Sequence, residues 1–285
     1  MSNVLFKKWE VNMKKQLTII PLVILLCFTF SSPQGEADSN VLEGFLFVEG
    51  GTFQMGSNDG NSDEKPVHSV TVSDFYMGKY EVTFNEYDAF CNATSKDNLN
   101  DYGMGRGSRP VISVSWFDAV EYCNWRSRKE NLAPCYAING NKVTCNFSAN
   151  GYRLPTEAEW EFAAKGGNLS RGYKYSGSNS VGDVGWYGSN SGNGTHPVGQ
   201  KQANELGLYD MSGNVWEWCW DWYDSNYYSS SPSTNPKGAS SGKYRVLRSG
   251  AWHDDDVRRL RTAARERDVP TDRSNGHTFR LSRTH

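Results

Sequence analysis

Gly207-Leu-Tyr-Asp-Met-Ser-Gly-Asn-Val-Trp-Glu-Trp218 is the most distinctive stretch of the chain. Two other stretches are similarly distinctive, namely Gly50-Gly-Thr-Phe-Gln-Met-Gly56 and Gly151-Tyr-Arg-Leu-Pro-Thr-Glu-Ala-Glu-Trp-Glu-Phe-Ala-Ala164. Each combines glycine, which permits turns, with large aromatic side chains that bury much area. This pattern favours a fold of structured loops around a few bulky core side chains.

Composition indicates one domain of mixed structure. The chain has 285 residues, of which 37% are hydrophobic and 13% aromatic, with ten Trp, fifteen Tyr and 28 Gly. So low a hydrophobic content with so many rings argues against a helical bundle and favours an α+β domain rich in loops. Residues 33–43 are predicted to form a polar linker. Residues 44–285 are predicted to form a single domain, because no second linker long enough to divide them follows.

The charge balance argues against nucleic acid as a partner. Thirty Lys and Arg residues stand against 32 Asp and Glu residues, so the net charge is −2. A protein without a basic field does not gather polyanions, and charge-based recognition must therefore be local. We expect a monomer with no nucleic-acid partner.

Three segments are predicted to be helices. The first covers about residues 84–91. The second follows Ser115, where Asp118 completes a Ser-x-x-Asp capping box. The third follows Thr156, with Glu159 in the same role.

Short strands are predicted from aromatic and β-branched runs that Gly, Asn, Ser and Pro interrupt, as in Phe45–Gly56 and His68–Tyr80. Residues 166–205 have little apolar periodicity, so regular elements are hard to place there. Such a stretch has to be held by aromatic side chains, a metal or surrounding contacts.

The N-terminus is predicted to be a targeting segment. Within residues 1–32, Lys14 and Lys15 directly precede an apolar stretch too short to span a membrane, and we expect this signal peptide to start at Met13. Cleavage after Ser31 would release a soluble protein, whereas lipidation of Cys27 would give a lipoprotein anchored in the bacterial outer membrane. Both outcomes place the mature protein outside the cytoplasm, either secreted or at the cell surface.

An oxidising compartment permits disulfides. Cys135 and Cys145 flank Asn139-Gly-Asn141, and a three-residue hairpin loop would place the two cysteines directly opposite each other. We therefore predict a disulfide between Cys135 and Cys145. The sequence leaves open how the other cysteines of the domain pair: Cys91, Cys123 and Cys219.

The three long motifs together resemble those of the formylglycine-generating-enzyme (sulfatase-modifying factor) family. The match runs from about Gly44 to the C-terminus. The resemblance implies a variant of the C-type lectin fold, with a small mixed sheet, a few helices and many structured loops.

The resemblance also implies a structural calcium ion. The residues that match the family's calcium ligands are Asp210 and Glu217, through their side chains, and Gly213 and Val215, through their carbonyls. Hard oxygen ligands at this spacing suit Ca²⁺. In the alternative interpretation, backbone and Arg contacts satisfy Asp210 and Glu217 without an ion. The histidines, His277 among them, are too dispersed along the chain to indicate another metal site.

The catalytic cysteines of the family are absent. Family enzymes use a pair of copper-binding cysteines shortly after the motif that matches Arg248-Ser-Gly-Ala-Trp252, since Cu(I) requires soft thiolates. Here the chain continues as His253–Arg261 and has no cysteine after Cys219. We therefore expect neither copper nor enzymatic activity. The alternative is an enzyme of the same family that uses unrecognised active-site residues.

The C-terminal region 245–285 has a composition of its own. Tyr244–His285 holds ten Arg and no Lys, Gln or Met. Its framework, which includes Arg248–Trp252 and Phe279–Leu281, resembles the terminal region of variable proteins made by diversity-generating retroelements. In those proteins, error-prone copying of adenines turns Asn codons into codons that exclude Lys, Gln, Glu, Met and Trp. The absences in the tail fit this rule, and Glu266 would be a fixed position.

The positions interleaved with this framework are predicted to be diversified and to form one ligand-binding face: His253, Asp254, Asp255, Asp256, Arg258, Arg259, Ala264, Arg267, Asp268, Val269, Asp272, Ser274, Asn275 and His277. Trp252 is a predicted aromatic anchor beside them. The charged, hydrogen-bonding character of the face suits a protein or another polar ligand. In the alternative interpretation, Asp254–Asp256 is an acidic turn and the arginines form framework salt bridges.

Overall fold

The computed structural model of the protein describes residues 42–285. The predicted signal peptide with Met13, the lipidation candidate Cys27 and nearly all of the 33–43 linker lie outside the described residues. Within residues 42–285, no helix is both long and apolar enough to cross a membrane.

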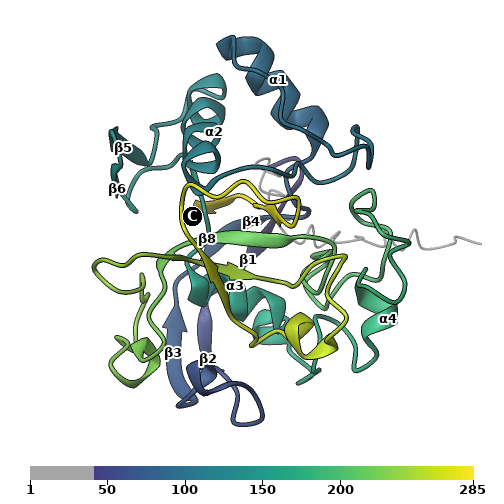
Figure 1. Cartoon of the computed structure of the whole chain (residues 1–285). Coiled ribbons are helices and arrows are strands. Elements are labelled where there is room, and N and C mark those ends of the chain that lie inside the picture. The colour runs from purple at the N-terminus through teal and green to yellow at the C-terminus, as the bar shows by residue number, and fades with distance from the viewer. Residues whose placement is uncertain (1–41) are drawn as a thin grey trace, which may run out of the picture. The chain divides into compact units, whose positions relative to one another are not determined.

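Short elements joined by long loops make up the described chain (Figure 1). The helices are α1 (Phe84–Thr94), α2 (Trp116–Lys129), α3 (Glu157–Ala164) and α4 (Val181–Val184), with the 3-10 turns η1 (Ser62–Glu64), η2 (Gly167–Leu169), η3 (Tyr227–Ser229) and η4 (Val257–Leu260). The strands are β1 (Phe45–Val48), β2 (Gly51–Met55), β3 (His68–Val72), β4 (Phe75–Gly78), β5 (Tyr136–Asn139), β6 (Lys142–Cys145), β7 (Tyr152–Arg153), β8 (Trp216–Trp222), β9 (Arg245–Arg248), β10 (Glu266–Asp268), β11 (His277–Thr278) and β12 (Ser282–Thr284).

Two four-stranded sheets form the centre of the fold. One has the strand order β1-β4-β12-β7 and the other the order β10-β9-β8-β11. The second sheet is mixed, because β11 runs parallel to β8 while its other pairs are antiparallel. Two hairpins, β2-β3 and β5-β6, complete the described strands. The predicted α+β class with a small mixed sheet and a few helices is confirmed.

Strand β8 separates two hydrophobic clusters. Alternate side chains of a strand point to opposite faces of the sheet. Trp216 and Trp218 accordingly pack in the cluster that contains α1 and α2, whereas Cys219 packs with Trp160 of α3 in the other. In Figure 1, α1 and α2 lie on one side of the sheets, and α3 with the β2-β3 hairpin lies on the other. The 207–218 motif therefore ends where the two clusters meet.

The predicted helix starts are confirmed. The Ser115 hydroxyl accepts a hydrogen bond from the Asp118 N–H at 3.2 Å, and the Thr156 hydroxyl accepts one from the Glu159 N–H at 3.2 Å. Both carboxylates in turn accept from the backbone N–H of the capping residue, which completes each capping box. Helix α1 starts at the predicted residue and continues to Thr94.

Aromatic contacts hold the 166–205 segment, whose only regular elements are η2 and α4. The rings of Trp186 and His196 are stacked with centroids 3.7 Å apart, and Lys201 Nζ lies 4.0 Å from the centroid of the Trp186 ring. This arrangement agrees with the expectation that aromatic side chains secure a stretch without apolar periodicity.

The predicted Cys135–Cys145 disulfide is wrong in the described structure, where both residues are free thiols. Strands β5 and β6 pair Tyr136 with Cys145, so the hairpin loop contains two residues, Gly140-Asn141, instead of three. Gly140 adopts a φ of +56°, which glycine tolerates and which a tight turn requires. The shorter loop shifts the register by one residue, and Cys135 lies beyond the position opposite Cys145.

Candidate ligand-binding face

The predicted variable region forms strands β9 to β12 and two loops. The first loop, residues 249–265, contains η4 and joins β9 to β10. The second loop, residues 269–276, joins β10 to β11. Every predicted variable position lies in one of these loops or on β10 or β11, so one sheet carries all of them.

Buried arginines fasten the first loop to the core. Arg265 donates to the two carboxylate oxygens of Glu157 at 2.7 and 2.8 Å. Arg248, at the end of β9, donates to Glu157 at 3.1 Å and to Glu161 at 2.7 Å. These four side chains are at most 2% exposed. Both arginines belong to the predicted framework, so the interpretation of the arginines as framework salt bridges applies to them.

Most predicted variable positions are exposed or half-buried. They are His253, Asp255, Asp256, Arg258, Arg259, Arg267, Asp268, Val269, Asp272, Ser274 and Asn275, and the predicted anchor Trp252 beside them is half-buried. They do not all share one face, because Arg267 and Asp268 are neighbours on β10 and neighbours on a strand point to opposite sides. Arg267 donates to the Tyr223 hydroxyl at 3.0 Å on its own side of the sheet.

Three predicted variable positions are buried: Asp254, Ala264 and His277. Asp254 accepts a hydrogen bond from the Ala251 N–H at 2.8 Å and pairs with Arg259 Nε at 2.9 Å. Asp254 therefore fixes the turn at the start of the first loop, which agrees with the interpretation of an acidic turn for this residue.

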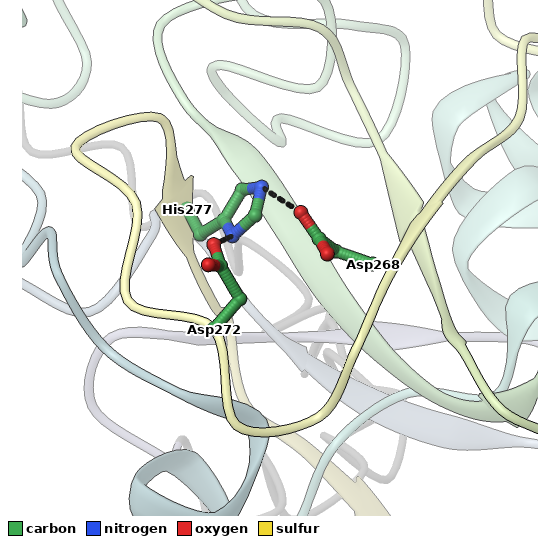
Figure 2. A group of neighbouring side chains, drawn as sticks. All are labelled: Asp268, Asp272 and His277. Carbon is green, nitrogen blue, oxygen red and sulfur yellow. Dashed lines mark ion pairs between the residues drawn. The ribbon is translucent and has the colours of Figure 1, made fainter.

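Asp268, Asp272 and His277 meet on this sheet although they lie on β10, the second loop and β11 (Figure 2). Asp268 Oδ2 is 3.8 Å from His277 Nε2, and Asp272 Oδ2 is 3.2 Å from His277 Nδ1. The strand pairing places Asp268 and His277 on the sheet face that carries Trp218. The rings of Trp218 and His277 meet edge to face with centroids 5.0 Å apart. The imidazole thus rests on an indole and has one carboxylate beside each nitrogen.

The members of this cluster differ in burial. The His277 side chain is 9% exposed, whereas 39% of Asp268 and 38% of Asp272 is exposed. Burial lowers the pKa of His277, and the two neighbouring carboxylates partly oppose this shift. His277 Nδ1 has no hydrogen-bond partner among the described residues. The cluster therefore holds a buried imidazole with an unsatisfied nitrogen beneath two accessible carboxylates.

The residues predicted to bind calcium are buried around the start of β8: Asp210, Gly213, Val215 and Glu217. Arg280 donates to the two Glu217 oxygens at 2.6 and 2.7 Å, and Trp160 Nε1 donates to one of them at 2.8 Å. For Glu217, these contacts agree with the alternative in which Arg and other protein groups satisfy the carboxylate.

Asp210 is satisfied at only one oxygen. Its Oδ2 accepts a hydrogen bond from the Gly199 N–H at 2.7 Å, but its Oδ1 is buried without a partner among the described residues. Glu81 Oε1 is likewise buried without a described partner. Burial raises the pKa of Asp210 to about 6, and burial together with the charges of Asp210 and Glu217 raises the pKa of Glu81. Free carboxylate oxygens fit Ca²⁺, so calcium at Asp210 remains a prediction here.

Four of the five cysteines of the described chain are buried, and Cys145 is half-buried. Burial raises the pKa of each thiol, and that of Cys145 to about 12. Reactive cysteines require the opposite shift, because the thiolate is both the nucleophile and the metal ligand. Cys219 is also close to the Asp221 carboxylate, which raises its pKa further.

Sequence reasoning missed two groups in this region. It rejected His277 as a metal ligand, yet the fold brings this side chain to Asp268 and Asp272. The available signal was that all three residues fall within the short stretch 268–277. Nothing in the sequence pointed to Glu81, because only the tertiary fold brings its carboxylate under the influence of the Asp210 and Glu217 charges.

The fold and the face define an α+β domain that displays loops from a mixed sheet. The chain belongs to the sulfatase-modifying factor family, because the sequence model of the Sulfatase-modifying factor enzyme 1-like domain matches residues 30–285.

Three relatives illustrate this family. Chaperone protein LppX of Paenibacillus barcinonensis is 41% identical over 268 residues, which cover 82% of this chain and 87% of the relative. The formylglycine-generating enzyme of Streptomyces coelicolor is 31% identical over 292 residues, which cover 88% of this chain and 93% of the relative. The solved structure of Treponema denticola variable protein 1 matches with a TM-score of 0.74 and 33% identity, over 85% of this chain and 95% of that chain. The resemblance to the enzyme family and to a variable protein is confirmed.

Proposed function

We propose that the protein is a non-catalytic, surface-displayed protein whose C-terminal face is diversified by a retroelement to bind varied ligands. One observation carries this proposal: framework arginines such as Arg248 and Arg265 are buried in ion pairs, while all but three of the predicted variable positions reach solvent. Loops on a rigid scaffold can change sequence without unfolding the domain. The similarity to Treponema denticola variable protein 1 supports the proposal.

The chemistry of the face favours a protein or another polar ligand. Its exposed side chains offer carboxylates, guanidinium groups and an amide, which form charge-assisted and bidentate hydrogen bonds. Trp252 is half-buried beside them and serves as an aromatic anchor. The relative named a chaperone protein supports a protein ligand, since chaperones bind other proteins.

The absence of enzymatic activity is part of the proposal. The raised pKa values of the described thiols support it, because neither oxidation nor copper binding proceeds readily from a buried thiol. Incubation with copper(I) and a cysteine-containing sulfatase peptide should yield no formylglycine by mass spectrometry. Turnover of the peptide would instead support the alternative of an enzyme with unrecognised active-site residues.

The display at the cell surface rests on the N-terminal sequence. We propose that the mature chain is extracytoplasmic, either secreted after cleavage at Ser31 or anchored in the outer membrane through lipidated Cys27. Metabolic labelling with palmitate distinguishes these outcomes: label and membrane association that disappear in the Cys27→Ser variant indicate the anchor. An unlabelled parent chain in the medium indicates cleavage, and a chain retained in the cytoplasm contradicts surface display.

The flanking DNA tests the diversification directly. A near-copy of the 3′ end of the gene should lie close to it, beside a reverse-transcriptase gene, and should differ from it mainly at adenines. A genomic region with neither the copy nor the reverse-transcriptase gene would overturn the proposal.

A further inference from the structure

The cluster of Asp268, Asp272 and His277 leaves one buried ring nitrogen without a hydrogen bond to any described residue. The His277 side chain is only 9% exposed, and its Nδ1 has no described hydrogen-bond partner even though Asp272 Oδ2 lies 3.2 Å away. A buried nitrogen without a partner is costly and calls for an explanation. One ligand atom from each residue lies within 4.8 Å of the other two, so a single ion could bind all three.

The distances suit a small divalent cation. Zinc bonds of about 2.0–2.2 Å place two ligand atoms of a tetrahedral ion about 3.4 Å apart. Asp272 Oδ2 and His277 Nδ1, at 3.2 Å, are close to this separation, whereas Asp268 Oδ2 lies 3.8 Å from the other ring nitrogen, Nε2. A single ion binds one ring nitrogen, so the carboxylate beside the other nitrogen has to swing toward it. The side chains of Asp268 and Asp272 are 39% and 38% exposed, which leaves them free to move.

We propose that Asp268, Asp272 and His277 bind one divalent transition-metal ion of the Zn²⁺ type on the binding face. An imidazole nitrogen with two carboxylates favours Zn²⁺ over Ca²⁺ and Mg²⁺, which prefer oxygen ligands alone. Three protein ligands leave a coordination position open, and the two accessible carboxylates direct it toward solvent. All three ligands are predicted variable positions, so the metal site belongs to this sequence variant of the protein.

The open position specifies a class of ligand. A carboxylate or another oxygen donor of a bound partner completes the coordination of the ion, as water does in its absence. This second step rests on the proposed ligand-binding function, whereas the metal site itself does not. The face would therefore recognise an acidic side chain or a chain terminus through the metal.

Calorimetric titration of the full chain with Zn²⁺ alone tests the site, with Ca²⁺ present in excess to occupy the predicted calcium position. We expect one Zn²⁺ per chain at the cluster. Asp272→Asn should weaken Zn²⁺ binding by about tenfold or more, because it removes one carboxylate ligand. The substitution is nearly isosteric and lies in the accessible second loop, so the fold should not change. The matched control is Asp255→Asn, an exposed Asp in the first loop outside the cluster, and it should bind Zn²⁺ like the parent chain.

A second variant and a spectroscopic probe sharpen the test. His277→Gln should abolish Zn²⁺ binding at the cluster, and its thermal unfolding without metal shows whether the buried substitution is tolerated. If it does not fold, Asp272→Asn decides alone. With Co²⁺ in place of Zn²⁺, added acetate should change the visible absorption bands, since acetate takes the open position. An unchanged spectrum would contradict the open position.

The outcomes separate this inference from the proposed function. Absence of Zn²⁺ binding to the parent chain, or equal binding by Asp272→Asn and Asp255→Asn, would overturn the metal site and leave the evidence from the flanking DNA intact. Zinc binding that depends on Asp272, in a gene without a template copy, would support the metal site and contradict the diversification.

Discussion

Replacing Arg265 with alanine tests whether framework and variable arginines differ energetically. The buried Arg265 guanidinium donates to both Glu157 oxygens at 2.7 and 2.8 Å and to the Asp63 carbonyl at 2.8 Å. Breaking a buried ion pair typically costs about 3–5 kcal/mol, because the remaining charge is uncompensated. Arg248 still contacts Glu157 at 3.1 Å in the variant. We therefore expect the lower end of this range, a loss of about 3 kcal/mol in the free energy of unfolding.

The matched variant is Arg258→Ala on the exposed surface. The Arg258 side chain is 78% exposed and pairs with Asp256, which is also accessible. Exposed ion pairs contribute little to stability, so we expect no measurable change. Urea unfolding followed by tryptophan fluorescence measures both variants, since the chain contains ten Trp. Equal losses in the two variants, or an unaltered midpoint for Arg265→Ala, would refute the division into a rigid framework and a tolerant surface.

Two further predictions concern buried titratable groups. Burial raises the pKa of Asp210 to about 6, above its unfolded value, so the calcium-free folded chain loses stability as the pH rises from about 4 to about 6. In urea unfolding at a series of pH values, Asp210→Asn should remove about 3 kcal/mol of this pH-dependent change in the free energy of unfolding. Ca²⁺ should stabilise the parent chain but not the variant. The same pH profile for parent and variant would contradict this. Ellman's reagent should label the described cysteines only after unfolding, because burial raises their pKa values and that of Cys145 to about 12. Rapid labelling of the folded protein would contradict this.

Local signals in the sequence predicted α1, α2 and α3 correctly but gave no sign of α4. Ser115 with Asp118, and Thr156 with Glu159, are capping boxes whose partners lie close together in the chain, so both can be identified without a structure. The long motifs likewise identified the family, and the 207–218 motif supplies tryptophans to the core. The framework of the C-terminal region was identified in the same way, from short motifs whose residues are close together in the chain.

Contacts between distant segments could not be predicted. His277 is buried because β11 pairs with β8 and the imidazole rests on Trp218, which no local pattern encodes. Asp254 is buried because it closes a turn onto the Ala251 N–H. The disulfide prediction failed for a different reason. The hairpin loop has two residues instead of three, which shifts the strand register by one residue. Gly140, with its φ of +56°, permits this shorter turn.

Sequencing the 3′ end of this gene across many isolates tests the central claim most directly. We expect substitutions to concentrate at the codons of the exposed loops and at adenines of the template, while the codons of Arg248, Arg265 and Arg280 stay constant. A C-terminal region that is invariant across isolates, or that varies equally at framework and loop codons, would contradict a diversified binding face.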